Sequence, residues 1–225
     1  MNQMISNRTG RPAFSGSELV FLRGEHFAPV AGGLTPRVQL LHADIRVKAH
    51  ELGEAILAAA ILGCEASGGI SLAVGAKKAF LGLRTVNVLT AEPAGTGAPW
   101  PEHSLESNLQ GIIRNGPIEV TGLVYRVLVE DESMPWELPA KIVQKGLHSR
   151  GLLEVEETRV LKVLKSHRYR LPDSTAALAA QSSLDEVQRL LRNTPSMRPD
   201  LWKLLVDQIS KGVKQRQKMD ESSND

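Results

Sequence analysis

Apolar residues recur at helical spacing in several parts of the chain, and this period is the main guide to its fold. One such stretch predicts a helix within residues 42–66 whose buried stripe is formed by Leu52, Ala55, Ile56, Ala59, Leu62 and Gly63. Ser67-Gly68-Gly69 then ends this helix, since glycine readily adopts the left-handed conformation of a C-terminal cap. Further helices are predicted from Ser104, over residues 120–128 and 138–147, from Ser183, and over 200–218.

Two other parts of the chain alternate with a period near two and predict β-hairpins. The first combines residues 70–74 with 80–89 around a loop at 75–78, and the second combines 152–156 with 159–171. The expected fold class is therefore mainly α with two β-hairpins. We expect a single helical domain around a helix-bundle core, with a wing-like second hairpin.

The ends of the chain differ in composition from this domain. Residues 1–35 are rich in Gly, Ser, Pro and Asn and predict a flexible N-terminal arm, in which residues 19–22 would form a short edge strand. The domain then covers residues 36–218, and residues 219–225 form a disordered tail. The chain has 225 residues, 42% of them hydrophobic and 23% charged, as in soluble globular proteins. It shows neither a signal-peptide pattern nor a membrane-spanning apolar run, so we expect a cytoplasmic protein.

The residue patterns of common catalytic sites are missing from this sequence. His50-Glu51-x-x-Glu54 has one of the two histidines of a zinc-protease helix, and the glycines near residues 69, 75 and 95 lack the spacing of a phosphate loop. The one cysteine, Cys64, excludes an internal disulfide and lies on an alanine-rich face, where we expect a buried thiol. We therefore expect no enzyme, no catalytic residue, no metal site and no cofactor.

The net charge of +2 conceals an uneven distribution. Residues 141–170 contain eight basic and three acidic residues, and the predicted second strand of the later hairpin has no acid. The last helix also has a basic side, opposite an apolar side that is typical of a packed helix. A basic hairpin suits either an anionic lipid surface or a phosphate backbone. The alternative is a solvated sheet face without a ligand.

Three stretches resemble the Golgi phosphoprotein 3 family, over about residues 40–195. These are the alanine-rich helix that runs into Gly68-Gly-Ile-Ser-Leu72, the loop Ala91-Glu-Pro-Ala-Gly-Thr-Gly97 before the next helix, and Ile142-Val-Gln-Lys-Gly-Leu147 with its hairpin and Arg170-Leu-Pro-Asp173. The resemblance implies a helical fold around a four-helix core in a peripheral membrane protein. In eukaryotic members this protein binds phosphatidylinositol 4-phosphate, docks cytosolic tails of membrane proteins and uses an apolar hairpin at the bilayer.

The binding residues of that family are not matched in this chain. The positions aligned with its headgroup arginines hold Leu57, Glu137 and Ala140, and the tryptophan position holds Lys48. The headgroup candidates are therefore taken from the basic residues of this sequence: Lys141, Lys145, Arg150, Lys162, Lys165, Arg168 and Arg170. The candidates for insertion into the bilayer are the apolar residues of the second hairpin: Val160, Leu161, Val163 and Leu164.

Under this interpretation the partners are an anionic membrane lipid and the cytosolic tails of membrane proteins. The protein would lie at the Golgi if the source is eukaryotic, and a homo-oligomer is left open. Two alternatives explain the same features. Residues 104–171 have the helix order of a winged-helix module, in which Lys141, Lys145 and His148 would enter the major groove of a nucleic acid. A protein-interaction adaptor without a lipid ligand is the other alternative.

Overall fold

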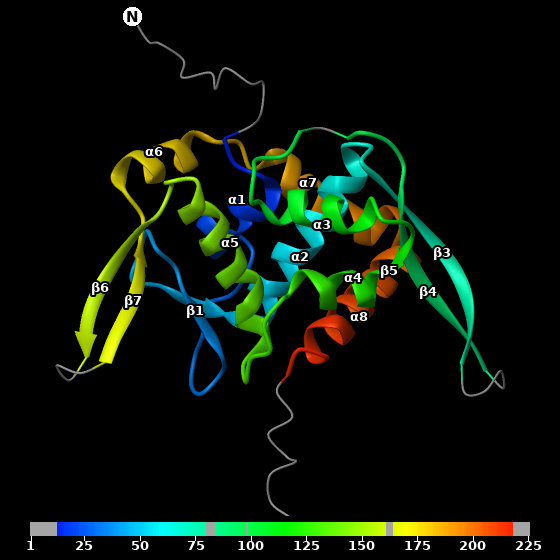
Figure 1. The fold of residues 1–225 in the computed structure, drawn as a ribbon, viewed down its shortest axis with the longest axis horizontal. Helices are drawn as coiled ribbons and strands as arrows, with labels where there is room; N and C mark the ends of the chain where they lie inside the picture. Colours follow the sequence, from blue (N-terminus) through cyan, green and yellow to red (C-terminus); the bar gives the residue numbers. More distant parts are fainter. Residues whose placement is uncertain (1–12, 80–83, 98, 161–163, 218–225) are drawn as a thin grey trace, which may run out of the picture.

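The fold is mainly helical, with hairpins at the two ends of its longest axis (Figure 1). The structure, a computed structural model, describes residues 13–79, 84–97, 99–160 and 164–217. Its helices are α1 (Gly16–Leu22), α2 (Ala49–Ala66), α3 (Leu105–Ile113), α4 (Val120–Val127), α5 (Leu138–Ser149), α6 (Asp173–Gln181), α7 (Asp185–Met197) and α8 (Pro199–Lys214), with short 3-10 helices η1 (Gly24–His26) and η2 (Pro135–Glu137). This arrangement confirms the predicted fold class.

Helix α2 forms the centre of the bundle and packs against α1, α3, α5, α7 and α8. The predicted helix is present, but the prediction of one buried stripe is wrong. Every residue from Ile56 to Cys64 is buried, because neighbouring helices cover all sides of this stretch. Small residues allow the close approach: a Cβ at Gly53 would lie 2.8 Å from the backbone oxygen of Trp136.

The N-terminal segment corrects the prediction of a flexible arm. Residues 19–22 belong to helix α1 and not to an edge strand, and Val20, Phe21 and Leu22 lie in the core. A capping box starts this helix, since Ser15 and Glu18 satisfy each other's backbone amides. The folded domain therefore includes residues 13–35 as well. The predicted arm residues 1–12 and the predicted tail residues 219–225 lie outside the described residues.

The first hairpin consists of β3 (Ile70–Ala79) and β4 (Arg84–Pro93), which form an antiparallel sheet with β5 (Ile118–Glu119). The predicted loop at residues 75–78 is wrong, because these residues continue β3 and pair with 85–88. The connection falls instead at residues 80–83, outside the described part. Two short strands that the sequence did not predict, β1 (Arg37–Gln39) and β2 (Arg46–Lys48), pair before α2.

The second hairpin consists of β6 (Glu154–Val160) and β7 (Leu164–Arg170) and projects from the body after α5 (Figure 1). Residues 159–171 were predicted as one strand, but Arg159 and Val160 end β6 and pair with Lys165 and Leu164. Acidic residues on β6 therefore face basic residues on β7, as in the pair Glu156 and Arg168. The connection, residues 161–163, lies outside the described residues.

The C-terminal helices complete the bundle. Helix α6 was not predicted, and Pro195 lies inside α7 where the sequence predicted a break. Helix α8 buries Leu201, Leu205, Ile209 and Val213 and exposes its lysines, as expected of a packed helix with a solvated basic side. In the ranges that the structure describes, no helix combines the length and hydropathy needed to cross a bilayer.

Candidate functional site

A cleft of about 420 Å³ lies between β1, α5 and β7 and collects basic side chains from all three elements. Lys141 and Lys145 are one helical turn apart on α5 and therefore share a face of that helix. Arg168 comes from β7 and Arg37 from β1. The structure thus brings together three of the seven predicted headgroup residues and adds Arg37, which the sequence analysis did not select.

Carboxylates neutralise part of this cleft. Lys141 Nζ lies 2.7 Å from Glu132 Oε2 and 3.7 Å from Glu137 Oε2, and Lys145 donates to Glu130. The hydrogen bond and positive charge of Lys141 lower the pKa of Glu132 below its ordinary value. In contrast, neither Arg37 nor Arg168 forms an ion pair with another residue that the structure describes. The two arginines are therefore the basic groups of the cleft that are not already held in an ion pair, although Glu156 lies opposite Arg168 in the hairpin.

Contacts between α5 and the hairpin hold one wall of the cleft in place. His148 Nδ1 lies 2.9 Å from the carbonyl oxygen of Leu153, and the His148 ring lies 5.7 Å from the Tyr169 ring, centroid to centroid. On the other side of α5, Gly146 packs so closely that an added Cβ would lie 2.2 Å from the backbone oxygen of His103. The lysines of α5 are thus presented by a helix that is fixed at both faces.

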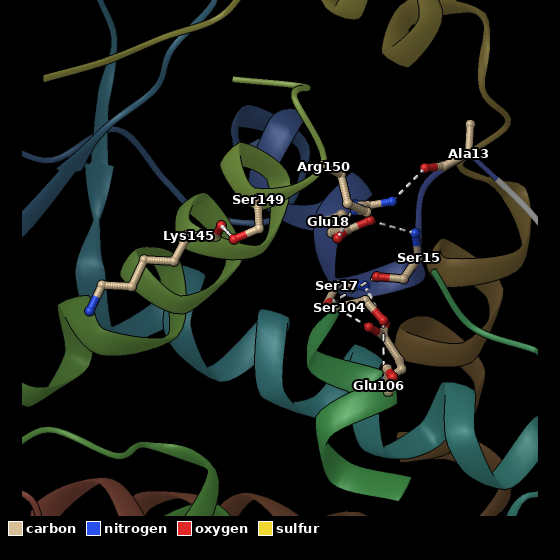
Figure 2. A network of polar contacts seen from close by, with 10 residues as sticks. Ala13, Ser15, Ser17, Glu18, Ser104, Glu106, Lys145, Ser149 and Arg150 are labelled. Atoms are coloured by element: carbon tan, nitrogen blue, oxygen red, sulfur yellow. Dashed lines mark hydrogen bonds and ion pairs between the residues drawn. The ribbon is translucent and has the colours of Figure 1, made fainter. Parts of the chain in front are cut away.

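Arg150 does not belong to the cleft, which changes the role predicted for it. Its guanidinium donates to the carbonyl oxygen of Ala13 at 3.0 Å and to the buried carboxylate of Glu18 (Figure 2). Figure 2 also shows Lys145 extending away from this network, on the other side of α5. With its side chain only 16% exposed, Arg150 joins the end of α5 to the N-terminal helix instead of facing a ligand.

The network around Arg150 contains a second buried carboxylate. Glu106 accepts hydrogen bonds from the amide and hydroxyl of Ser17, both at 2.8 Å, and Glu18 accepts from the Ser15 amide at 2.9 Å. Burial raises the pKa of Glu18 to about 7, although the charge of Arg150 and the Ser15 amide act in the opposite direction. Three elements, α1, α3 and α5, are therefore tied together by charged groups inside the core.

The remaining predicted site residues lie on the second hairpin. Arg170 bonds Glu154 Oε2 at 2.8 Å across the strands, and this contact raises its pKa. Lys162, Leu161 and Val163 lie outside the described residues. For Val160, Leu164 and Lys165 the backbone strands are described, but their side chains are not.

Long-range packing explains why Arg37 was missed. It lies more than a hundred residues before Lys141, in a three-residue strand without a clear periodic signal. The carboxylates that face the lysines come from η2 and the loop before it, which are also remote from β7 in the sequence. The i, i+4 spacing of Lys141 and Lys145 was the one feature of this cleft that the sequence analysis could use.

The environment of Cys64 is that of a residue that contributes to the core and not to a reactive site. Cys64 is buried, its Sγ lies 3.6 Å from the carbonyl oxygen of Glu106, and burial raises its pKa well above the ordinary value. This environment confirms the expected buried thiol. No group of three or more His, Cys, Asp or Glu side chains suited to a metal comes together within the described ranges.

Comparisons with protein-family models, with curated proteins and with solved structures found no match for this chain. The resemblance to the Golgi phosphoprotein 3 family accordingly stays a prediction from the sequence.

Proposed function

We propose that this protein is a non-enzymatic peripheral membrane protein that binds the headgroup of an anionic phospholipid in the cleft between β1, α5 and β7. The observation that carries this proposal is the convergence of Arg37, Lys141, Lys145 and Arg168 on one hollow of the surface. Guanidinium groups present a planar set of donors that fits phosphate oxygens, and lysine ammonium groups add charge.

The carboxylates of the cleft do not prevent such binding. The Lys145–Glu130 pair is more than half exposed on both sides, and exposed ion pairs of this kind are worth about 0–1 kcal/mol. A phosphate group can therefore replace Glu130 at small cost. Each basic residue near an anionic bilayer contributes about 1 kcal/mol. Because three carboxylates line the cleft beside its four bases, recruitment should be weak and salt-sensitive.

The projecting hairpin β6–β7 forms one wall of this cleft through Arg168 and Tyr169. A headgroup bound there would bring the hairpin to the membrane surface. Its connecting residues are apolar and basic in sequence, which suits insertion at the level of the headgroups. By family resemblance the lipid would be phosphatidylinositol 4-phosphate, at the Golgi in a eukaryotic cell, and tails of membrane proteins would be further partners.

The winged-helix alternative has less support. The order α3, α4, α5 and β6–β7 matches such a module. However, Glu130 and Glu132 lie against the α5 lysines that would contact DNA, so the loop that carries them borders this face of α5. Strand β1 also borders the same face of α5, whereas a recognition helix must be free to enter the major groove.

Sedimentation with vesicles tests the proposal. The vesicles contain phosphatidylcholine alone, phosphatidylcholine with phosphatidylserine, or phosphatidylcholine with phosphatidylinositol 4-phosphate at the same total charge. We expect binding to both anionic compositions and a decrease with salt. The Arg37→Gln/Arg168→Gln variant removes two bases, so its affinity should fall by about thirtyfold, or about 2 kcal/mol.

The matched control is Lys203→Gln/Lys214→Gln, which removes the same charge from the exposed side of α8. It should bind as the unmodified protein does. Equal losses of affinity in both variants would mean that net charge alone drives binding, and would overturn the assignment of the cleft as the binding site. Absence of binding to all vesicles would overturn the membrane function, and duplex DNA would then be the next ligand to test.

A further inference from the structure

Strand β3 is an edge strand that stands at the end of the molecule opposite the cleft (Figure 1). It pairs with β4 along its ten residues, and no backbone hydrogen bond joins residues 71–78 to any other described segment. From Ala73 onward its side chains are exposed on both faces of the hairpin as far as Lys78. A ten-residue strand is about 34 Å long, so an extended row of unpaired donors and acceptors faces solvent.

Residues 70–76 of this edge lack the features that usually prevent association, and the two lysines of the strand lie at its far end. Edge strands are commonly protected by charged side chains, proline or a bulge. Strand β6 follows this rule with Glu154 and Glu156, but the first charged residue of β3 is Lys77. Before it, the strand presents alanine, glycine and Val74, whose side chain is 52% exposed.

We propose that β3 is a self-association surface, on which β3 of a second copy of this chain pairs in the antiparallel direction. A two-fold axis through Gly75 places residues 71–79 of the two copies opposite one another and joins two three-stranded sheets into one of six strands. Such a contact is closed and isologous, as in most protein dimers. It gives a defined surface to the homo-oligomer that the sequence leaves open, and it does not depend on lipid binding.

The distribution of charge favours this arrangement of a second copy. Both lysines of β3 lie at the same end of the strand, so antiparallel pairing places them at opposite ends of the dimer contact. Lys77 then lies opposite Ala73 and Lys78 opposite Leu72, and no like charges are paired.

Analytical ultracentrifugation over a range of micromolar concentrations tests this proposal, with a concentration-dependent dimer as the expected result. The Val74→Lys/Ala76→Lys variant places lysines directly opposite each other across the contact, since Val74 of one copy faces Ala76 of the other. It should weaken dimerisation by at least about tenfold. The matched control is Thr85→Lys/Asn87→Lys, which adds the same charge to two exposed positions of β4 on one face, one strand away from the edge, and should still dimerise.

Amide hydrogen exchange provides a readout that needs no variant. Protection of residues 71–79 should increase with protein concentration in the unmodified chain, because pairing covers the outer amides of β3. A monomer at every concentration would overturn the proposal. A dimer that the Val74→Lys/Ala76→Lys variant leaves intact, or that gives no added protection in β3, would also overturn it. In either of these two cases the copies meet elsewhere.

Discussion

The buried carboxyl of Glu18 should make the stability of the fold depend on pH. Its pKa is about 7 in the fold against an ordinary value of 4.5, so the native state binds the proton more tightly than the unfolded chain does. The contribution of Glu18 to stability is then greatest below pH 4.5, falls as the pH rises to 7, and is constant above that. At about 1.4 kcal/mol for each pH unit, the loss amounts to about 3 kcal/mol.

Urea denaturation of the unmodified chain and of Glu18→Gln, at steps between pH 5 and 8, measures this effect. Other groups titrate in both proteins, so the difference between the two free energies of unfolding isolates Glu18. We expect this difference to change steadily from pH 5 to about pH 7 and then to level off, since the glutamine cannot titrate. Glu65→Gln is the matched control, because Glu65 pairs with Arg198 at the surface. Parallel pH curves for Glu18→Gln and the unmodified chain would refute the assignment.

Three further predictions follow from packing, burial and sequence. Gly146→Ala should lower the free energy of unfolding by about 1–3 kcal/mol in urea denaturation, because the added Cβ would meet the backbone of His103. The control is Gly111→Ala, at an open position of α3, which should leave this free energy unchanged or raise it by less than about 1 kcal/mol. Lys162→Glu/Lys165→Glu should weaken sedimentation with anionic vesicles, and unchanged binding would argue against the hairpin. Cys64 should react with a thiol reagent only as fast as the protein unfolds, and rapid labelling of the native protein would contradict its burial.

Local periodicity was sufficient for most of the helices. The i, i+3, i+4 spacing identified α2, but not that it lies at the centre, because burial on all sides depends on helices from both earlier and later parts of the chain. Helix α1 was missed although its signal was present. Ser15 and Glu18 have the spacing of a capping box, and the glycine and serine content around them obscured it.

The hairpin connections and the cleft were harder to predict. In β3, Gly75 suggested a turn. The strand continues past it because Gly75 and the residues after it pair with β4, beginning with Gly75 and Val88. The cleft depends on side chains that only the tertiary fold brings together, such as Arg37 and Lys141. Arg150 was predicted to bind a headgroup because it precedes a basic hairpin in the sequence. In the fold it donates instead to Glu18 and holds α1 in place.

The contact between Arg150 and α1 also bears on the order in which the chain folds. Ala13 and Glu18 find their partner 132 or more residues later in the chain. During synthesis, α1 therefore cannot dock completely until about two thirds of the protein has been made. Closing so long a loop slows folding. Until then the apolar faces of α1 and α2 are incompletely covered, so the nascent chain exposes surface that is prone to aggregation during this interval.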